Sequence, residues 1–281
     1  MCIRDSKGPA TIIAEDPTCA PFRPILDTLS GQERNGWDKR DQSVAASAWT
    51  PDVRAQFEAV GKAMRNAADQ MVALAKLTPH RVMRELYEQN IAYSRAYADS
   101  IATYSPTDDN LALVAISAGD SLNDICAAIS YESAAARGPL MAVPPTPSQV
   151  APVGNPKDPQ RFLPGPNPVC AQWSTMVDDY MTATAEWRSV PSDVPASAWT
   201  PEQRAINDAV AQVMESSADK LQQLGERSGN LTLQDFAELA AQYRLAYAQS
   251  VPTYVAADNF LASAAHGLTG LVYAACNATK A

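Results

Sequence analysis

Three tyrosines in each half of the chain recur at helical spacing and are the side chains best suited to contact a ligand. A row of phenols along one helix could line a cleft for a small molecule, or bind a haem iron through a phenolate. In helical bundles, tyrosines more often bury the ring and hydrogen-bond the hydroxyl at the edge of the core, which is the structural alternative. We expect no resident cofactor. The candidate ligand-binding residues are Tyr93, Tyr97, Tyr104, Tyr243, Tyr247 and Tyr254.

Four cysteines are distributed as two pairs, one pair in each half. Cys19 and Cys126 bracket the first half, and Cys170 and Cys276 bracket the second. No Cys-x-x-Cys spacing occurs and neither histidine lies near a cysteine in the sequence, so no zinc site is expected. One disulfide in each half fits better, with two buried free thiols in each half as the alternative. Because disulfides persist in oxidising compartments, this pairing predicts an extracytoplasmic protein.

Other reactive patterns are missing from the sequence. The two histidines, His80 and His266, fall at unrelated positions in the two halves, which excludes a duplicated catalytic triad. Neither the Glu-x-x-His motif of di-iron bundles nor a phosphate-binding glycine loop occurs, and the run 267–270 reads as a helix surface of small residues. We therefore expect no catalytic residue, no metal site and no enzyme. An envelope enzyme with catalytic groups in one half only is the least favoured alternative.

An internal repeat organises the elements that would position these residues. The six residues Ala46–Pro51 return unchanged as Ala196–Pro201, a shift of 150 positions, and the tyrosine positions follow the same shift. Repeats of this kind predict a duplicated structural unit. Alanine-rich composition with few phenylalanines favours helices over strands.

Apolar residues at three- and four-residue steps predict four helices in each half. Helix one is expected at 21–40 and 171–188, and helix two begins at the N-caps Thr50 and Thr200, each followed by proline. Helix three is expected to start at Thr78 or Thr232, and helix four near 107 or 258. Short polar turns imply an antiparallel four-helix bundle, in which the two cysteines of each half lie at the same end.

A proline-rich stretch, residues 134–168, separates the two halves and contains ten prolines. We expect it to form a semi-extended linker without helix, which keeps two bundles apart or lets one swing against the other. A role as a proline ligand for an SH3-like partner is the alternative. The expected all-α organisation is a lead-in at 1–18, a first bundle at 19–133, the linker at 134–168 and a second bundle at 169–281.

Composition limits the classes of partner. The 281-residue chain carries a net charge of −9 and has a pI of about 4.7, so nucleic acid is not an expected partner. No run of about 18 apolar residues is visible, so we expect no membrane-spanning helix in the sequence as given. Residues 1–6 look foreign and are interpreted as a sequencing artefact, which predicts that a signal peptide or anchor helix has been lost upstream.

Several segments resemble uncharacterised actinobacterial proteins of the mycobacterial type. They are residues 19–21, 35–37, 48–51, 77–88 and 93–98, and the resemblance covers nearly the whole chain after residue 7. It implies an exported protein anchored by an N-terminal transmembrane helix, and it implies no activity. The leading functional hypothesis is a non-enzymatic binding or interaction module of the cell envelope with an unknown protein partner. The alternative is a carrier of a small apolar ligand, haem or lipid, in the tyrosine-lined bundles.

Overall fold

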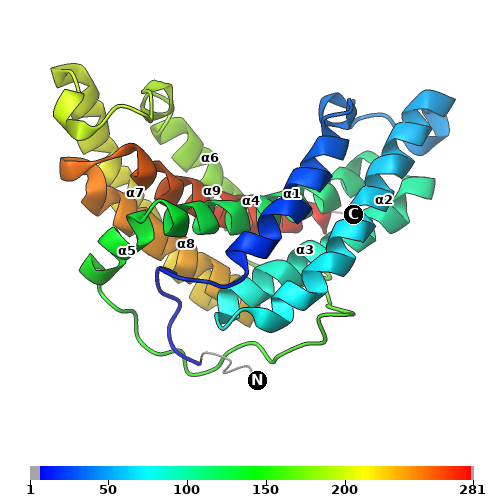
Figure 1. Cartoon of the computed structure of the whole chain (residues 1–281), viewed down its shortest axis with the longest axis horizontal. Coiled ribbons are helices and arrows are strands. Elements are labelled where there is room, and N and C mark those ends of the chain that lie inside the picture. Colours follow the sequence, from blue (N-terminus) through cyan, green and yellow to red (C-terminus); the bar gives the residue numbers. More distant parts are fainter. Residues whose placement is uncertain (1–6, 280–281) are drawn as a thin grey trace.

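The computed structural model describes residues 7–279, and helices dominate this part of the chain (Figure 1). No strand occurs in it, so the all-α prediction is confirmed. Two sets of four long helices follow each other, which we call unit 1 (α1–α4) and unit 2 (α6–α9). Their bounds are α1 Cys19–Glu33, α2 Pro51–Leu77, α3 Arg81–Ser100, α4 Asp109–Ser130, α6 Cys170–Ala183, α7 Pro201–Arg227, α8 Leu231–Ser250 and α9 Asn259–Ala278.

Short 3-10 turns connect these helices at matching places in the two units. In unit 1 they are η1 Trp37–Lys39, η2 Ala46–Ala48, η3 Ile101–Thr103 and η4 Pro106–Asp108. In unit 2 they are η6 Trp187–Ser189, η7 Ala196–Ala198, η8 Val251–Thr253 and η9 Ala256–Asp258.

Local capping chemistry explains where the long second helix of each unit begins. The Thr50 hydroxyl accepts a hydrogen bond from the Val53 amide at 3.3 Å, and the Thr200 hydroxyl accepts one from the Gln203 amide at 3.2 Å. The Gln203 side chain in turn accepts a hydrogen bond from the Thr200 amide at 3.0 Å, which completes a capping box. These two starts lie where the sequence predicts them.

Other helix boundaries differ from the sequence-based expectation. Helix one ends at Glu33 in unit 1 and at Ala183 in unit 2, and not near residues 40 and 188, because in both units the chain leaves the helix in a turn that leads into a 3-10 helix, η1 or η6. The N-cap of α3 is His80, which makes no side-chain cap. The N-cap of α8 is Asn230, whose side chain accepts from the Leu233 amide at 2.9 Å, so the expected threonine caps at 78 and 232 are wrong.

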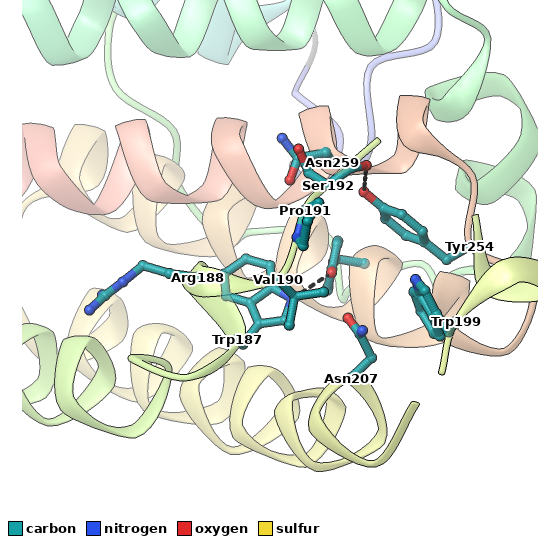
Figure 2. A pocket seen from close by; sticks show the side chains of 10 residues that line it. Trp187, Arg188, Val190, Pro191, Ser192, Trp199, Asn207, Tyr254 and Asn259 are labelled. Atoms are coloured by element: carbon teal, nitrogen blue, oxygen red, sulfur yellow. Dashed lines mark hydrogen bonds between the residues drawn. The ribbon is translucent and has the colours of Figure 1, made fainter. Parts of the chain in front are cut away.

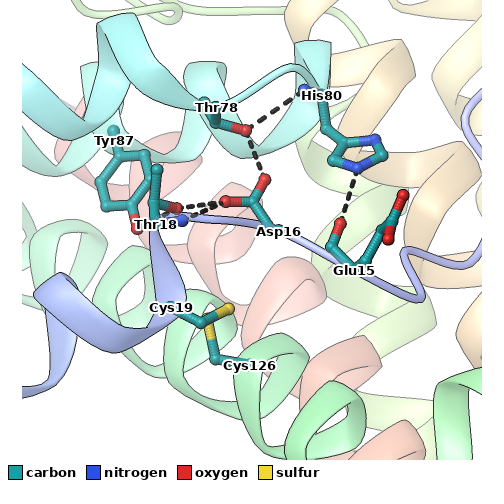
Figure 3. The surroundings of a disulfide bond; sticks show 8 residues. All are labelled: Glu15, Asp16, Thr18, Cys19, Thr78, His80, Tyr87 and Cys126. Atoms are coloured by element: carbon teal, nitrogen blue, oxygen red, sulfur yellow. Dashed lines mark hydrogen bonds between the residues drawn. A yellow bond between two sulfur atoms is a disulfide. The ribbon is translucent and has the colours of Figure 1, made fainter.

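Each unit contains one disulfide that joins the start of its first helix to the end of its last. The pairs are Cys19–Cys126 and Cys170–Cys276. The lead-in is fixed beside the first of them (Figure 3): the Asp16 carboxylate accepts from the amide and hydroxyl of Thr18 and from the Thr78 hydroxyl, and His80 contacts the Glu15 carbonyl at 2.8 Å. The lead-in is therefore part of the folded unit.

The two units dock directly along α4 and α9, which make the most extensive contact between any two helices (Figure 1). Gly267 of α9 lies so close to α4 that a Cβ there would stand 2.6 Å from the Ser121 hydroxyl and 3.1 Å from the Ser121 amide. Small residues allow this approach of the two backbones. The expectation that a linker keeps the units apart or lets them swing is not what the structure shows.

The proline-rich segment packs against both units. It opens with a helical turn, α5 Ser133–Arg137, followed by η5 Gly138–Leu140, which corrects the expectation that it contains no helix. Arg137 then pairs with Asp258 at the start of α9. Further along, the buried Phe162 ring lies between Tyr93 of α3 and Phe236 of α8, at centroid distances of 6.1 and 5.5 Å. The segment is thus a strap that holds α3 and α8 together.

One stretch, Pro106–Ser130, is long and apolar enough to cross a membrane, with a mean hydropathy of 1.4, contrary to the sequence-based expectation. It contains α4, and 56% of its most apolar window is buried. Its place against α3 and α9 makes it a core helix in this structure. The expectation for residues 1–6 lies outside the described residues.

Candidate functional site

The six candidate tyrosines are all buried, and each is at most 3% exposed. Tyr93 donates to the Leu163 carbonyl of the strap, Tyr104 donates to the Gln42 carbonyl, and Tyr97 accepts from the Trp37 indole. Tyr243 faces the backbone of Ile13 in the lead-in. The structure brings Tyr97 to Tyr104 and Tyr247 to Tyr254, at centroid distances of 6.3 and 5.9 Å, and the second pair borders a cavity.

Burial raises the pKa of every one of these six phenols above its usual value. For Tyr254, burial followed by the charges of Asp258 and Asp193 raises the pKa to about 12. The phenols therefore keep their protons at neutral pH. A phenolate ligand to haem iron is disfavoured by these surroundings.

In unit 1, an aromatic frame encloses an arginine. We define the frame as Trp37, Trp49, Tyr97 and Tyr104, which pack edge to face or tilted against one another. The Arg40 guanidinium carbon lies 3.4 Å from the Trp37 ring centroid, and its nitrogens donate to Asp109 at 2.6 and 2.8 Å. Phe57 fills the remaining space against Trp49, at a centroid distance of 4.0 Å. Arg40 and Phe57 thus occupy this frame from within the chain itself.

Unit 2 keeps the same frame but leaves it open. Its members are Trp187, Trp199, Tyr247 and Tyr254, and the Trp187 indole donates to the Tyr247 hydroxyl at 2.8 Å. The positions of Arg40, Phe57 and Asp109 are taken by the smaller or neutral residues Val190, Asn207 and Asn259. The result is a cavity of about 290 Å³, which we call the aromatic pocket (Figure 2).

A second cavity, of about 360 Å³, lies where the two units meet, and we call it the cleft. Residues of α4 form one side, among them Asp120 and Asp124, and residues of α6, η6 and α9 form the other, among them Arg188 and His266. Gly267 and Gly270 of α9 also line it. The aromatic pocket and the cleft share Trp187, Arg188 and Asn259, so they adjoin.

Charge is segregated across the cleft. Burial and then the Asp120 carboxylate raise the pKa of Asp124 to about 7, and burial with the same Asp120 raises the pKa of Glu33 on α1 to about 6. On the other side, partial burial and then the charges of Arg244 and Arg188 lower the pKa of His266. The α4 side therefore carries carboxyl groups, of which Asp124 is only partly ionised near pH 7, and the other side carries the Arg188 cation beside a His266 whose lowered pKa favours the neutral imidazole.

Arg244 of α8 places a buried positive charge behind the basic side. It is 1% exposed, its guanidinium carbon lies 3.9 Å from the Tyr180 ring centroid, and it donates to the hydroxyls of Ser217 and Thr269. No carboxylate pairs with it among residues 7–279. Ser94 occupies the same position of unit 1, so this charge belongs to unit 2 alone.

Within residues 7–279, no group of three or more His, Cys, Asp or Glu side chains is placed to hold a metal ion. The cavities present instead aromatic faces, carboxamides and separated charges. Such groups can bind and orient a ligand.

Comparison with known proteins identifies the family. The model of a family described as mycobacterial ESX-1 associated protein matches residues 3–280. The chain belongs to this family. An uncharacterised protein of Mycolicibacterium smegmatis (strain MKD8) is 51% identical over 274 residues, which cover 98% of this chain and 73% of that protein. No solved structure matches.

Sequence reasoning missed the aromatic pocket and the cleft. The signal for the pocket lies in the repeat itself, where the frame residues are kept between halves while Arg40, Phe57 and Asp109 change. The cleft carries no comparable signal. Its sides come from α4 and from α6 and α9, which only the docking of the two units brings together.

Proposed function

We propose that this chain is a non-enzymatic binding module of the mycobacterial cell envelope that binds a protein component of ESX-1 secretion in its cleft. The observation that carries the proposal is the charge-segregated cleft between two disulfide-containing units. Family membership supports the choice of partner, because the family is described as ESX-1 associated. The two disulfides support an extracytoplasmic location, where such bonds persist.

A cleft with opposite charges on its two sides favours one orientation of a bound segment. A partner helix with basic residues toward Asp120 and Asp124, and acidic residues toward Arg188, would match it. The reversed orientation would bring like charges together, at a cost of several kcal/mol. Charge segregation therefore provides specificity in addition to affinity.

A carrier of a small apolar ligand, haem or lipid, is the second candidate. A groove of about 370 Å³ between α6 and α7, partly lined by Met176 and Leu224, favours it. Lys220, Asp179 and Arg227 also line this groove. A carrier would retain lipid or haem through purification, which mass spectrometry of the extracted protein detects.

Site-specific crosslinking in mycobacterial cells tests the leading proposal. A photoreactive residue is placed at Asp120 in the cleft, and at the exposed Glu58 on α2 as the matched control. We expect a crosslink to an ESX-1 component from position 120 only, and its loss when Arg188→Glu reverses the basic side. Equal crosslinking from both positions, or none to an ESX-1 component, would refute the proposal. Free thiols at all four paired cysteines in intact cells would refute the extracytoplasmic location.

A further inference from the structure

We propose that the aromatic pocket of unit 2 receives an arginine side chain from the partner protein. This inference rests on the proposed function, because the partner supplies the arginine. It names the contact that would anchor that partner next to the cleft.

Unit 1 shows how this frame holds a guanidinium group. Arg40 lies flat on Trp37, donates to the Trp37 carbonyl at 3.1 Å and pairs with Asp109. The side chains of Arg40 and Asp109 are only 5% and 4% exposed. A planar cation on a tryptophan face, with its edge in hydrogen bonds, is a favourable arrangement for arginine and a poorer one for lysine.

The aromatic rings of the unit 2 frame are arranged almost as they are in unit 1. The Trp187 and Tyr247 rings lie 5.4 Å apart, against 5.8 Å for Trp37 and Tyr97. Trp199 donates to the Val194 carbonyl at 2.9 Å, the same distance as from Trp49 to the Val44 carbonyl. The aromatic rings of unit 2 are therefore in place although Val190 stands at the position of Arg40, and a ligand would bind to a preformed surface.

Three replacements open the pocket and supply hydrogen-bond acceptors. Val190 in place of Arg40 removes the side chain that covers the tryptophan face, and Asn207 in place of Phe57 shortens the opposite side. The Asn207 amide nitrogen donates to the Gln203 carbonyl at 2.8 Å, which leaves its oxygen to accept. Asn259 in place of Asp109 makes no side-chain hydrogen bond within residues 7–279, so its oxygen also can accept from a guanidinium.

The surrounding charge is compatible with a cation. Asp193 and Asp258 lie close enough to Tyr254 to raise its pKa, although Arg137 already pairs with Asp258. The positive charge of Arg188 at the rim disfavours binding of a cation, whereas the net charge of the chain, −9, favours it. A neutral amide in place of Asp109 makes the pocket weaker than the unit 1 site. Weak binding of one side chain suits an anchor that acts together with contacts in the adjoining cleft.

The continuity of the two cavities ties the arginine to the partner. Trp187, Arg188 and Asn259 border both, so a chain lying in the cleft passes the mouth of the pocket. An arginine on that chain would reach the Trp187 face while its neighbours contact the two sides of the cleft.

Titration of the full chain with N-acetyl-L-argininamide tests the inference, followed by NMR of the tryptophan indole N–H groups. We expect the Trp187 and Trp199 signals to shift on addition of the probe, while Trp37 and Trp49 of the occupied unit 1 frame act as internal controls. N-acetyl-L-lysinamide is expected to bind at least tenfold more weakly. Asn259→Asp restores the acid of unit 1 and should tighten binding about tenfold, because ionised acceptors make stronger hydrogen bonds.

Val190→Arg is the decisive variant, because it supplies the guanidinium from within the chain. We expect it to abolish binding of the probe while the Trp37 signal stays unchanged, which shows that the fold is intact. Persistent binding in this variant, no shift at Trp187 in the parent chain, or equal shifts with glucose would overturn the inference. Crosslinking from position 120 without any argininamide binding would leave the proposed function standing and refute the arginine anchor alone.

Discussion

Adding one methyl group at Gly267 should separate the two units or strain their contact. A Cβ at this position would lie 2.6 Å from the Ser121 hydroxyl, 3.1 Å from the Ser121 amide nitrogen and 3.3 Å from the Ser117 carbonyl oxygen. The hydroxyl can rotate only by giving up its 2.7 Å hydrogen bond to the Ser117 carbonyl. The two backbone atoms can move only if α4 and α9 move apart.

Gly270, one turn further along the same helix, provides a matched control. A Cβ there meets only the Ser117 hydroxyl, at the ordinary contact distance of 3.5 Å. Both substitutions to alanine gain about 0.5–1 kcal/mol of helix propensity. Overpacking at position 267 opposes that gain with about 1–3 kcal/mol. Gly270→Ala should therefore stabilise the protein, and Gly267→Ala should be about 1–3 kcal/mol less stable than Gly270→Ala.

Urea unfolding of the two disulfide-intact variants measures this difference, provided that the transition is two-state. Small-angle scattering of Gly267→Ala should also show a larger radius of gyration if the units separate. Equal stability of the two variants would refute the reasoning, because it would mean that α4 and α9 do not approach this closely in solution.

Three further predictions concern ion pairing, pH and the disulfide of unit 1. Arg40→Val leaves the buried Asp109 carboxylate without its cation and should cost about 3–5 kcal/mol in urea unfolding. Adding Asp109→Asn, which copies the residues of unit 2, should recover most of that loss; a double variant as unstable as the single one would contradict this account. The folded pKa of Asp124, about 7, exceeds its ordinary value of 3.8, so the unfolded chain loses this proton first as pH rises. Stability should therefore fall between about pH 4 and 7, and Asp124→Asn should gain about 1–2 kcal/mol at pH 8 and little at pH 4, with a pH-independent gain counting against the assignment. Replacing Cys19 and Cys126 by serine opens a link between residues 107 positions apart and should cost about 2–5 kcal/mol, measured by urea unfolding, whereas an unchanged midpoint would show that this bond does not brace the unit.

Local sequence was sufficient to predict the helices and much of what stabilises each unit. Helix periodicity, the threonine-proline starts at Thr50 and Thr200, and the pairing of cysteines at one end of a bundle all depend on residues within one unit. Helix boundaries that depend on backbone conformation were harder to predict from the sequence. Helix one ends at Glu33 and at Ala183 in turns that a stripe of apolar residues does not reveal.

Tertiary structure alone decided how the units are joined and where a ligand can bind. Prolines at 139–168 indicate an extended segment, but they do not say that Phe162 packs between α3 and α8. Docking of α4 on α9 depends on the fit of two helix surfaces that are far apart in the sequence. Small residues such as Gly267 contribute to this fit because they have no side chain that would keep the two backbones apart. The cleft exists only because of that docking, and the aromatic pocket only because Val190, Asn207 and Asn259 together fail to fill a frame that unit 1 fills. A cavity forms where the side chains of several elements together do not fill the space between them. Its presence therefore follows from how those elements pack and from no single residue pattern.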